Sequence, residues 1–228
     1  MSAKRMLDVT LAGIALIVVA PLLALLAIGI RLAGPGPIFY RAQRVGRDSR
    51  PFTMYKLRTM RIGDAATTVI TAQGDPRIFP LGRLLRRLKL DELPQLVNIL
   101  RGEMSIVGPR PEDPSMVQRF YAPFYYKSFD VPPGLTSPGS IYAYTHGEAQ
   151  LDLRDAERSY GEQLLPIKMA LDLVYVARAG VGYDIALICR TVWTLGTALL
   201  GRRSFPLPPE LPEAQRILRQ EGDTRMMA

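Results

Sequence analysis

Two adjacent carboxylates, Asp91 and Glu92, are the side chains of this chain whose types and spacing best suit chemistry. Pro94 follows them and suits the first turn of a helix, so the pair is predicted to precede a helix N-terminus, whose positive field favours carboxylates and phosphates. Adjacent side chains point in different directions on a helix, which excludes the paired attack of a glycosidase. One carboxylate can instead attack phosphorus while its neighbour holds Mg²⁺. The alternative is structural, with one acid capping the helix and the other facing solvent.

Basic residues accumulate on both sides of this pair. A guanidinium can hold a phosphate through two parallel hydrogen bonds, and the prolines around Arg110 keep its backbone stiff. We therefore expect phosphate binding from this group, whereas solvated surface charge is the better interpretation for Arg83 and Arg87. The candidate phosphate-binding residues are Lys56, Arg58, Arg86 and Arg110.

The composition of the chain limits its domain number, its binding partners and its cofactors. The 228 residues can bury one sizeable core, which favours one globular domain plus an anchor. A net charge of +8 and a pI near 9.8 predict anionic partners, namely nucleic acid, lipid headgroups or a phosphorylated small substrate. The single cysteine, Cys189, excludes an internal disulfide, and with the lone His146 it leaves no Cys/His cluster for zinc or haem.

The segment from Leu11 to Ile30 carries no charge and is long enough to cross a bilayer, which takes about 20 apolar residues. Pro21 interrupts it, and proline removes a backbone donor and kinks a helix. Basic residues flank both ends, so both ends are predicted to be cytoplasmic. We expect a helix that enters the membrane, breaks at Pro21 and returns to the same face. The alternatives are an ordinary spanning anchor or a signal peptide.

The rest of the chain predicts a mostly helical α+β fold. Short apolar runs at 38–40 and 52–55, separated by turn residues, predict a β-hairpin. Leucines at helical spacing from Leu81 to Leu88 predict a basic amphipathic helix that leads to Asp91, followed by a short helix that ends at Gly102. The expected units are a re-entrant anchor over 1–33, a cytoplasmic catalytic domain over 34–201 and a Pro-rich tail over 202–228.

The second half of the chain gives weaker patterns. Prolines from Pro109 to Pro114 predict a stiff, extended stretch, and residues 131–139 predict a loop rich in Pro and Gly. Two helices are expected, over roughly 156–179 and 184–200. The second is apolar around much of its circumference, so it belongs either to the core or to the bilayer surface. The tail after Arg202 is expected to be loosely held.

Five motifs follow one another along the first half of the chain. They are Lys4 to Asp8, Gly36 to Arg41, Tyr55 to Met60, Leu90 to Gln95 and Met104 to Pro111. In this order they resemble the motifs of the bacterial sugar transferases, the monotopic phosphoglycosyl transferases. The chain resembles their minimal catalytic form, without the extra N-terminal spans of longer members. The stretch from Val131 to Tyr144 differs from the usual family pattern, and Ala20-Pro21 replaces the frequent Ser-Pro.

The resemblance implies transfer of a sugar 1-phosphate from a nucleotide sugar, usually a UDP-sugar, to a polyprenyl phosphate such as undecaprenyl phosphate, with release of UMP. It implies that Asp91 attacks the sugar-proximal phosphate to form a phosphosugar-enzyme and that Glu92 binds Mg²⁺. Lys56, Arg86 and Arg110 match positions expected to contact phosphates or nucleotide, and Asp172 is a further candidate. The implied location is the cytoplasmic face of the bacterial inner membrane, at the start of glycan assembly.

Two other classes of function remain as alternatives. One is a membrane-tethered basic protein that binds anionic lipid or nucleic acid, although the basic residues lack the interleaved aromatic residues that nucleic-acid stacking requires, so no nucleic acid is expected. The other is an inactive scaffold of a glycan-assembly complex. The sequence leaves open which sugar is transferred, which glycan pathway is served and whether the chain forms a homodimer.

Overall fold

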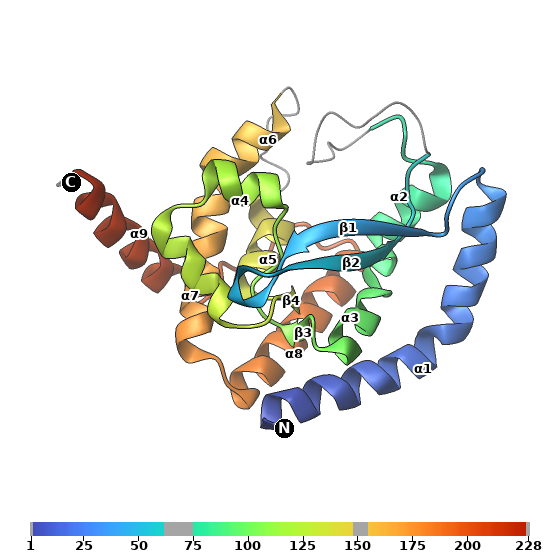
Figure 1. The fold of residues 1–228 in the computed structure, drawn as a ribbon, viewed down its shortest axis with the longest axis horizontal. Helices are drawn as coiled ribbons and strands as arrows, with labels where there is room; N and C mark the ends of the chain where they lie inside the picture. The colour runs from blue at the N-terminus through green and yellow to red at the C-terminus, as the bar shows by residue number, and fades with distance from the viewer. Residues whose placement is uncertain (1, 62–74, 148–154, 227–228) are drawn as a thin grey trace.

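The computed structural model describes residues 2–61, 75–147 and 155–226, which include every site residue proposed from the sequence. The described chain is mostly helical, as predicted, with small β elements in the middle (Figure 1). A long N-terminal helix curves along one side of the molecule. A β-hairpin crosses the front, and the C-terminal helices lie on the other side.

Helix α1 spans Ala3–Leu32 and begins where the Ser2 hydroxyl accepts a hydrogen bond from the Arg5 backbone N–H at 3.3 Å. The helix is bent (Figure 1) but continuous through Pro21, so the helix break expected at this proline is absent and a bend is present instead. Its most apolar stretch of 18 residues has a mean hydropathy of 2.9, and only 6% of that stretch is buried inside the protein. Among the described residues, α1 is the helix that is long and apolar enough to cross a membrane.

Both ends of α1 are bonded to the same globular body. Near the N-terminus, Lys4 Nζ donates to Asp184 Oδ2 at 2.8 Å, and Asp8 Oδ1 accepts from the Ile106 backbone N–H at 2.9 Å. Near the C-terminus, Ile30 is fully buried and packs in a cluster with Leu57. The basic residue Lys4, which the sequence suggested as a topology signal, therefore also docks the helix.

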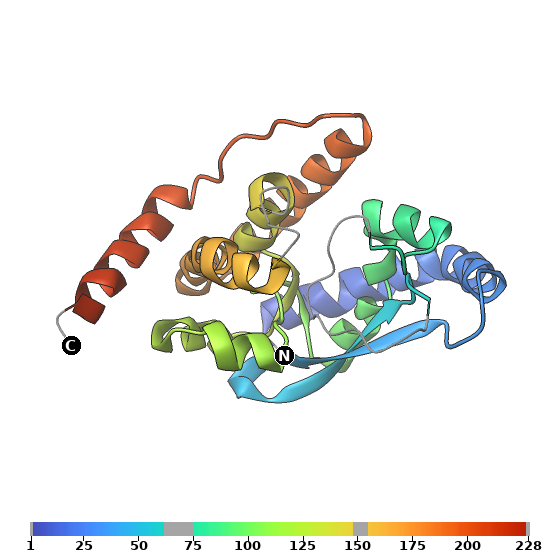
Figure 2. The same ribbon diagram turned by 90° about the horizontal axis from the view of Figure 1, so that it is seen from above.

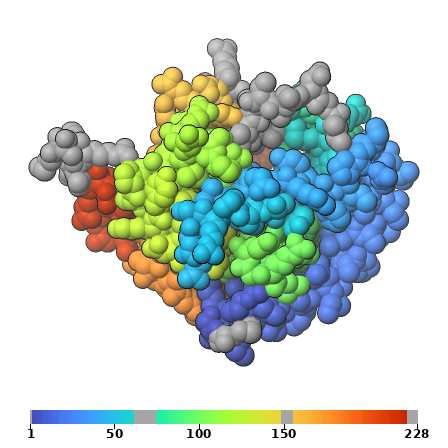
Figure 3. All heavy atoms as spheres, viewed as in Figure 1, coloured from blue at the N-terminus to red at the C-terminus, as the bar shows by residue number. Residues whose placement is uncertain are grey.

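The predicted hairpin is present. Strands β1 (Phe39–Val45) and β2 (Pro51–Leu57) pair antiparallel, with Phe39 opposite Leu57. The turn between them contains the 3-10 helix η1 (Arg47–Ser49), where Asp48 and Ser49 adopt positive φ. Figure 3 shows the hairpin lying across the front of the molecule, between α1 and the yellow-green segment that follows the strand β3.

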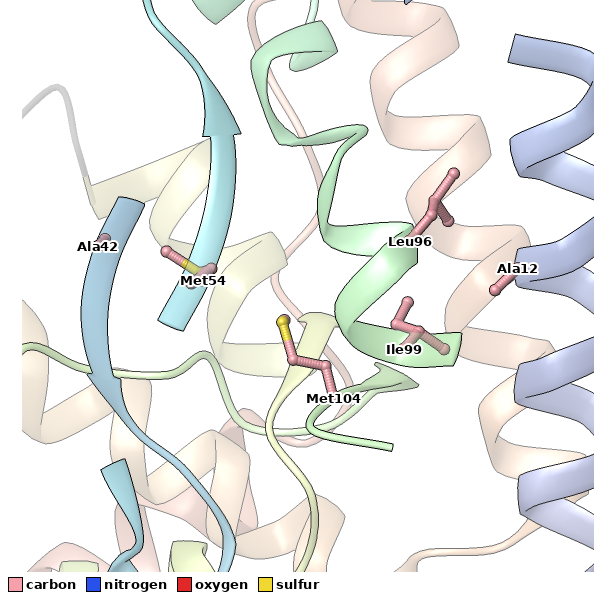
Figure 4. Packing of buried hydrophobic residues seen from close by; sticks show 6 residues of the cluster. All are labelled: Ala12, Ala42, Met54, Leu96, Ile99 and Met104. Atoms are coloured by element: carbon pink, nitrogen blue, oxygen red, sulfur yellow. The ribbon is translucent and has the colours of Figure 1, made fainter. Parts of the chain in front are cut away.

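One core cluster joins the hairpin to α1 through the helix α3 (Gln95–Arg101), and Figure 4 shows its buried members. Helix α1 contributes a small residue, which lets the two helices approach closely, and the hairpin contributes side chains from both strands. This packing fixes the position of the segment that carries the carboxylate pair. The members are Ala12, Ala42, Met54, Leu96, Ile99 and Met104.

The carboxylate pair lies between two short helices. Helix α2 (Pro80–Arg87) has Pro80 in its first turn and is the basic amphipathic helix predicted from the sequence. The 3-10 helix η2 (Leu90–Glu92) carries the pair, and α3 follows it with Pro94 as the N-cap and ends at Gly102, whose φ is 84°. The predicted order of helix, carboxylates, short helix and glycine stop is confirmed.

A second small sheet begins after this segment of the chain. Strand β3 (Ser105–Val107) pairs in parallel with β4 (Gly134–Thr136), which the sequence placed in a loop. The glycines that follow β3 and begin β4 allow the contact, because a Cβ at either Gly108 or Gly134 would collide with the other segment's backbone. Both strands are too short to give a period-2 signal in the sequence.

Several helices surround these strands. The expected extended stretch ends early, because Pro114 begins α4 rather than prolonging an irregular segment. Proline is favoured there, since the first N–H of a helix has no partner in the helix. The two long helices expected after 155 are present, the first with a π-helical turn inside it. The bounds are α4 Pro114–Phe120, η3 Pro123–Asp130, α5 Pro138–Tyr142, η4 Ala143–Gly147, α6 Ala156–Ser159, η6 Tyr160–Leu164, α7 Leu165–Arg178 and α8 Val181–Leu199.

The expectation of a loosely held tail is wrong. An extended segment runs from α8 to the helix α9 (Leu211–Met226), which packs against α7 (Figure 2). Ala214 is fully buried in that contact. Glu210 accepts hydrogen bonds from Arg190 and from the Tyr183 hydroxyl, so the segment before α9 is bonded to α8. Charge pairing and apolar packing together hold a tail whose proline content suggested disorder.

Candidate active site

Asp91 is a buried carboxylate that keeps one oxygen unpaired. Its side chain lies in η2 and the residue is 7% exposed. Its Oδ1 atom is inaccessible to solvent and has no hydrogen-bond partner among the described residues. A buried, unpaired carboxylate oxygen is costly, and such atoms call for an explanation such as a catalytic role or a missing ligand. Because a helix cap would accept a hydrogen bond from a backbone N–H, the unpaired Oδ1 of Asp91 favours a reactive role over a capping role.

Glu92 is held by cations from two separate elements. Arg110, in the segment after β3, donates to both Glu92 oxygens, with 3.1 Å from Nη1 to Oε2 and a second hydrogen bond from Nη2 to Oε1. Lys56, near the end of β2, donates to Oε1 at 3.3 Å. The fold thus brings together three of the sequence-predicted residues, and the Arg110 contact has the bidentate geometry that guanidinium groups also use for phosphates.

The two carboxylates have opposite pKa shifts. Burial raises the pKa of Asp91, and the negative charge of Glu92 adds to this effect, while Lys56 opposes it. Burial would also raise the pKa of Glu92, but the charges of Arg110 and Lys56 outweigh burial and hold that pKa well below its ordinary value. Burial lowers the pKa of Lys56, although Glu92 partly offsets this. Pairs whose surroundings push their pKa values apart are typical of catalytic sites.

Arg86 and Lys89 complete the positive surroundings of Asp91. Arg86 Nε donates to Thr59 Oγ1 at 3.0 Å, and its charge acts to lower the pKa of Asp91. Close packing makes this possible, because any side chain at Gly82 would collide with the Thr59 backbone. Lys89 adopts the left-handed conformation, with φ at 55°, directly before η2, and its charge acts on both carboxylates.

Arg58 has a different place from the one expected. It is 6% exposed, and its guanidinium donates to the carbonyl oxygens of Ile30 at 3.0 Å and Gly34 at 2.7 Å, with a third hydrogen bond to Pro35. These carbonyls belong to the last turn of α1 and the turn that follows. The side chain is therefore committed to fixing the end of α1, and this geometry does not support phosphate binding.

Asp172 is also separated from the carboxylate pair. It lies on α7, is fully buried, and accepts a hydrogen bond from the Gly139 N–H at 3.0 Å, near the start of α5. Its Oδ2 has no hydrogen-bond partner among the described residues. Burial raises the pKa of Asp172 to about 6. The contacts show a residue that orients the β4–α5 turn, and they include none with Asp91 or Glu92.

Sequence reasoning missed Lys89 and Gln95 as site residues. Lys89 directly follows the basic amphipathic helix predicted from the sequence, and its left-handed backbone conformation has no sequence signal. Gln95 is 1% exposed, and both polar atoms of its side chain are buried without partners among the described residues. Its signals in the sequence are its place at the end of the Leu90 to Gln95 motif and its short separation from Asp91.

The described part of the chain contains no cluster of three or more His, Cys, Asp or Glu residues that could hold a metal by themselves. Mg²⁺ does not require one, since it commonly binds through one or two carboxylates together with substrate phosphates. Asp91 and Glu92 fit this requirement, because Asp91 Oδ1 is a free oxygen donor. For Glu92 to contribute, one of its oxygens must exchange a hydrogen bond from Arg110 or Lys56 for the metal.

Comparison with known proteins finds relatives that match most of this chain. A UDP-glucose:undecaprenyl-phosphate glucose-1-phosphate transferase of Caulobacter vibrioides is 36% identical over 197 residues, which cover 85% of this chain and 70% of that protein. A UDP-N-acetylgalactosamine-undecaprenyl-phosphate N-acetylgalactosaminephosphotransferase of Aeromonas hydrophila is 34% identical, over 87% of this chain and 45% of that protein. An exopolysaccharide production protein of Rhizobium leguminosarum is 34% identical, over 83% of this chain and 92% of its own length.

The family model described as bacterial sugar transferase matches residues 1–198, which include α1, the hairpin, the carboxylate pair and α7. The motifs that suggested this family thus lie in one continuous match that also contains the buried Asp91 and its cationic neighbours. This chain belongs to the bacterial sugar transferase family.

Proposed function

We propose that this protein transfers a sugar 1-phosphate from a UDP-sugar to undecaprenyl phosphate and releases UMP. One observation carries the proposal: Asp91 is buried with a free carboxylate oxygen, directly beside a second carboxylate that two cations hold ionised. The names of the relatives, which specify UDP-sugar donors and an undecaprenyl phosphate acceptor, support the reaction.

In the first step, an Asp91 oxygen attacks the sugar-linked phosphorus of the donor. The bond between that phosphorus and the bridging oxygen breaks, and the electron pair leaves with UMP. In the second step, an oxygen of the polyprenyl phosphate attacks the same phosphorus, and the bond to Asp91 breaks to restore the carboxylate. The raised pKa of Asp91 makes its carboxylate a stronger base, and therefore a better nucleophile, than an ordinary aspartate.

The cations fit the charge changes of these steps. Arg110 and Lys56 hold Glu92 in the described structure, and both can turn to the phosphate oxygens of a bound donor. Arg86 supplies further positive charge from α2. Mg²⁺ held by Glu92, with Asp91 as the second carboxylate, would neutralise the diphosphate and stabilise the leaving UMP. Arg58 and Asp172 act indirectly in this proposal, by fixing α1 and the β4–α5 turn.

We further propose that α1 is re-entrant and that the catalytic part lies on the cytoplasmic face of the inner membrane. Two observations support this: both ends of α1 are bonded to one body, and the outer side of the helix is apolar and exposed, with Ile17 at 77% and Leu25 at 67%. Leu81 packs against α1 at Gly29, so α2 connects the membrane helix to the site. The anchor thus keeps Asp91 near the lipid phosphate.

The test is release of UMP by the purified chain with a panel of UDP-sugars, with and without undecaprenyl phosphate and Mg²⁺. We expect one sugar to give release that requires Mg²⁺, and intact-mass measurement without acceptor to detect a phosphosugar adduct. Asp91→Asn keeps the shape of the side chain and should abolish both signals while the protein stays folded. Arg83→Met, on the exposed side of α2, serves as the control. Wild-type activity in Asp91→Asn would exclude this nucleophile. No release with any sugar would favour a lipid-binding or scaffold role.

A further inference from the structure

Gln95 is a buried amide whose hydrogen-bonding groups have no partner in the described structure. It is the first residue of α3 and is 1% exposed. Its Nε2 and Oε1 atoms are both inaccessible to solvent and unpaired among the described residues. A primary amide offers two donors and an acceptor, and burying them unpaired costs free energy that an apolar residue of the same size would not cost. The amide therefore needs a partner that arrives from outside.

The neighbouring amide on the same helix shows that the fold can satisfy such groups. Asn98 is also buried, yet its Oδ1 accepts from the Tyr55 N–H at 3.1 Å. Its Nδ2 donates to the Thr53 carbonyl at 2.8 Å and to Glu103 at 2.7 Å. Asn98 thereby joins α3 to β2. Gln95 therefore lacks partners because of its position on α3, and not because buried amides on this helix in general are left unpaired.

That position is one helical turn after Asp91. Leu93 and Pro94 have helical backbone angles, so η2 continues into α3 without a reversal. The backbone N–H groups of Leu93 and Leu96 bond to carbonyls three residues back, so this segment is wound more tightly than an α-helix and Gln95 follows Asp91 by little more than one turn. Asp91 Oδ1 is likewise buried and unpaired among the described residues. Two orphaned polar groups, an acceptor and an amide, therefore lie on neighbouring turns of one short helical segment.

We propose that the Gln95 amide contacts the phosphosugar group on Asp91, with Nε2–H donating to a phosphoryl oxygen as the covalent intermediate forms. This inference rests on the proposed function and adds a catalytic residue to it. An amide donor suits the position, because a further cation beside Lys56, Lys89 and Arg86 would lower the pKa of Asp91 and weaken the nucleophile. A fixed neutral donor stabilises negative charge that develops on the phosphoryl group without this effect.

The test compares Gln95→Met with Asn98→Met in the full-length protein. Methionine has nearly the volume of glutamine and no donor. We expect Gln95→Met to keep or raise the melting temperature, since it removes an unpaired polar group, while single-turnover formation of the Asp91 adduct slows about 100-fold, as for loss of one transition-state donor. Asn98→Met should lower the melting temperature, because it leaves the Thr53 and Tyr55 backbone groups unpaired. Gln95→Glu, which has the same shape but a carboxylate in place of the donor, is a second variant and should slow adduct formation as well.

The outcomes separate this inference from the proposed function. If the wild-type protein forms the adduct and Gln95→Met forms it at the same rate, the inference is wrong and the amide is a tolerated structural cost. It is also wrong if Gln95→Met lowers the melting temperature as Asn98→Met does, because Gln95 then has a structural partner such as an internal water. If the wild-type protein forms no adduct at all, the proposed function fails and this inference with it.

Discussion

The electrostatics of two adjacent residues divide their roles. Asp91 and Glu92 share a 3-10 turn, yet burial raises the pKa of one while Arg110 and Lys56 lower that of the other. The difference arises from side-chain contacts, because Glu92 accepts three hydrogen bonds from cations and Asp91 Oδ1 accepts none. Glu92 therefore stays ionised across the working range of pH. The acidic limb of a pH profile for the first chemical step should belong to Asp91.

Substitution of Lys56 tests that assignment. The proposed attack requires the ionised form of Asp91, so the rate should rise with pH through the pKa of this residue. The Lys56 charge opposes the upward shift. In Lys56→Met we expect the midpoint of the acidic limb to move to higher pH, along with a lower plateau, because a phosphate ligand is also lost. Single-turnover adduct formation between pH 4 and 8 measures it, with Arg83→Met as the control. An unmoved midpoint would assign the limb to another group.

Asp172 gives a prediction about stability. Its folded-state pKa of about 6 exceeds the ordinary aspartate pKa of 3.8, so the folded protein binds more protons than the unfolded chain between these values. The free energy of unfolding should therefore fall as pH rises through this window, by about 3 kcal/mol. Asp172→Asn keeps an acceptor for the Gly139 N–H and removes the charge. We expect it to be more stable than wild type at pH 8 and no more stable at pH 4, measured by denaturation at both pH values. Parallel pH curves would contradict this.

Among the helices and strands, those determined by contacts between residues close in the sequence were predicted correctly. The hairpin, α2 and the short helix after the carboxylates follow from hydrophobic spacing and from residues such as Gly102, and each is present. The β3–β4 pair was missed because three-residue strands far apart in sequence have no period to detect. The docking of α9 depends on a distant contact, in which Arg190 holds Glu210.

In the candidate site, too, some residues could be predicted from the sequence and others only from the three-dimensional structure. The meeting of Lys56, Glu92 and Arg110 could be predicted, because the phosphate chemistry requires such residues and the family motifs place them. The role of Arg58 could not, because only the three-dimensional position of the end of α1 decides where its guanidinium binds. The unpaired state of Gln95 is likewise visible only from burial.

Arg58 provides the prediction at this scale. Replacing it with methionine leaves the carbonyls of Ile30 and Gly34 without their donor, so we expect the protein to lose about 2–4 kcal/mol of stability. Lysine should restore little of it, because one ammonium group cannot replace the planar fork of donors. Thermal denaturation measures the loss, and donor KM should stay near that of wild type in the folded variant. A stable variant with a raised KM would instead identify Arg58 as a substrate ligand.

At the scale of the whole molecule, the course of α1 is the main constraint. A straight helix of 30 residues is about 45 Å long, enough to carry its ends beyond both faces of a bilayer core of about 30 Å. Here both ends are bonded to one body, through Lys4 to Asp184 and through Arg58 to Ile30. A spanning helix would have to break one of these attachments. In the re-entrant topology that we propose, the exposed apolar side of the bent helix lies within the lipid of one leaflet.

Cysteine labelling in intact spheroplasts and in inverted membrane vesicles tests this topology. Cys189 is first replaced by serine. Single cysteines at the exposed positions Ser2 and Ser49 then report on which side of the membrane the chain lies before and after α1. We expect an impermeant maleimide to label neither in intact spheroplasts and both in inverted membrane vesicles. A cysteine at Ile17, which is 77% exposed, should resist labelling in both preparations, because lipid covers it, and should react in detergent. Opposite accessibility at Ser2 and Ser49 would instead require a spanning helix, and the contact between Lys4 and Asp184 would then be absent in the membrane.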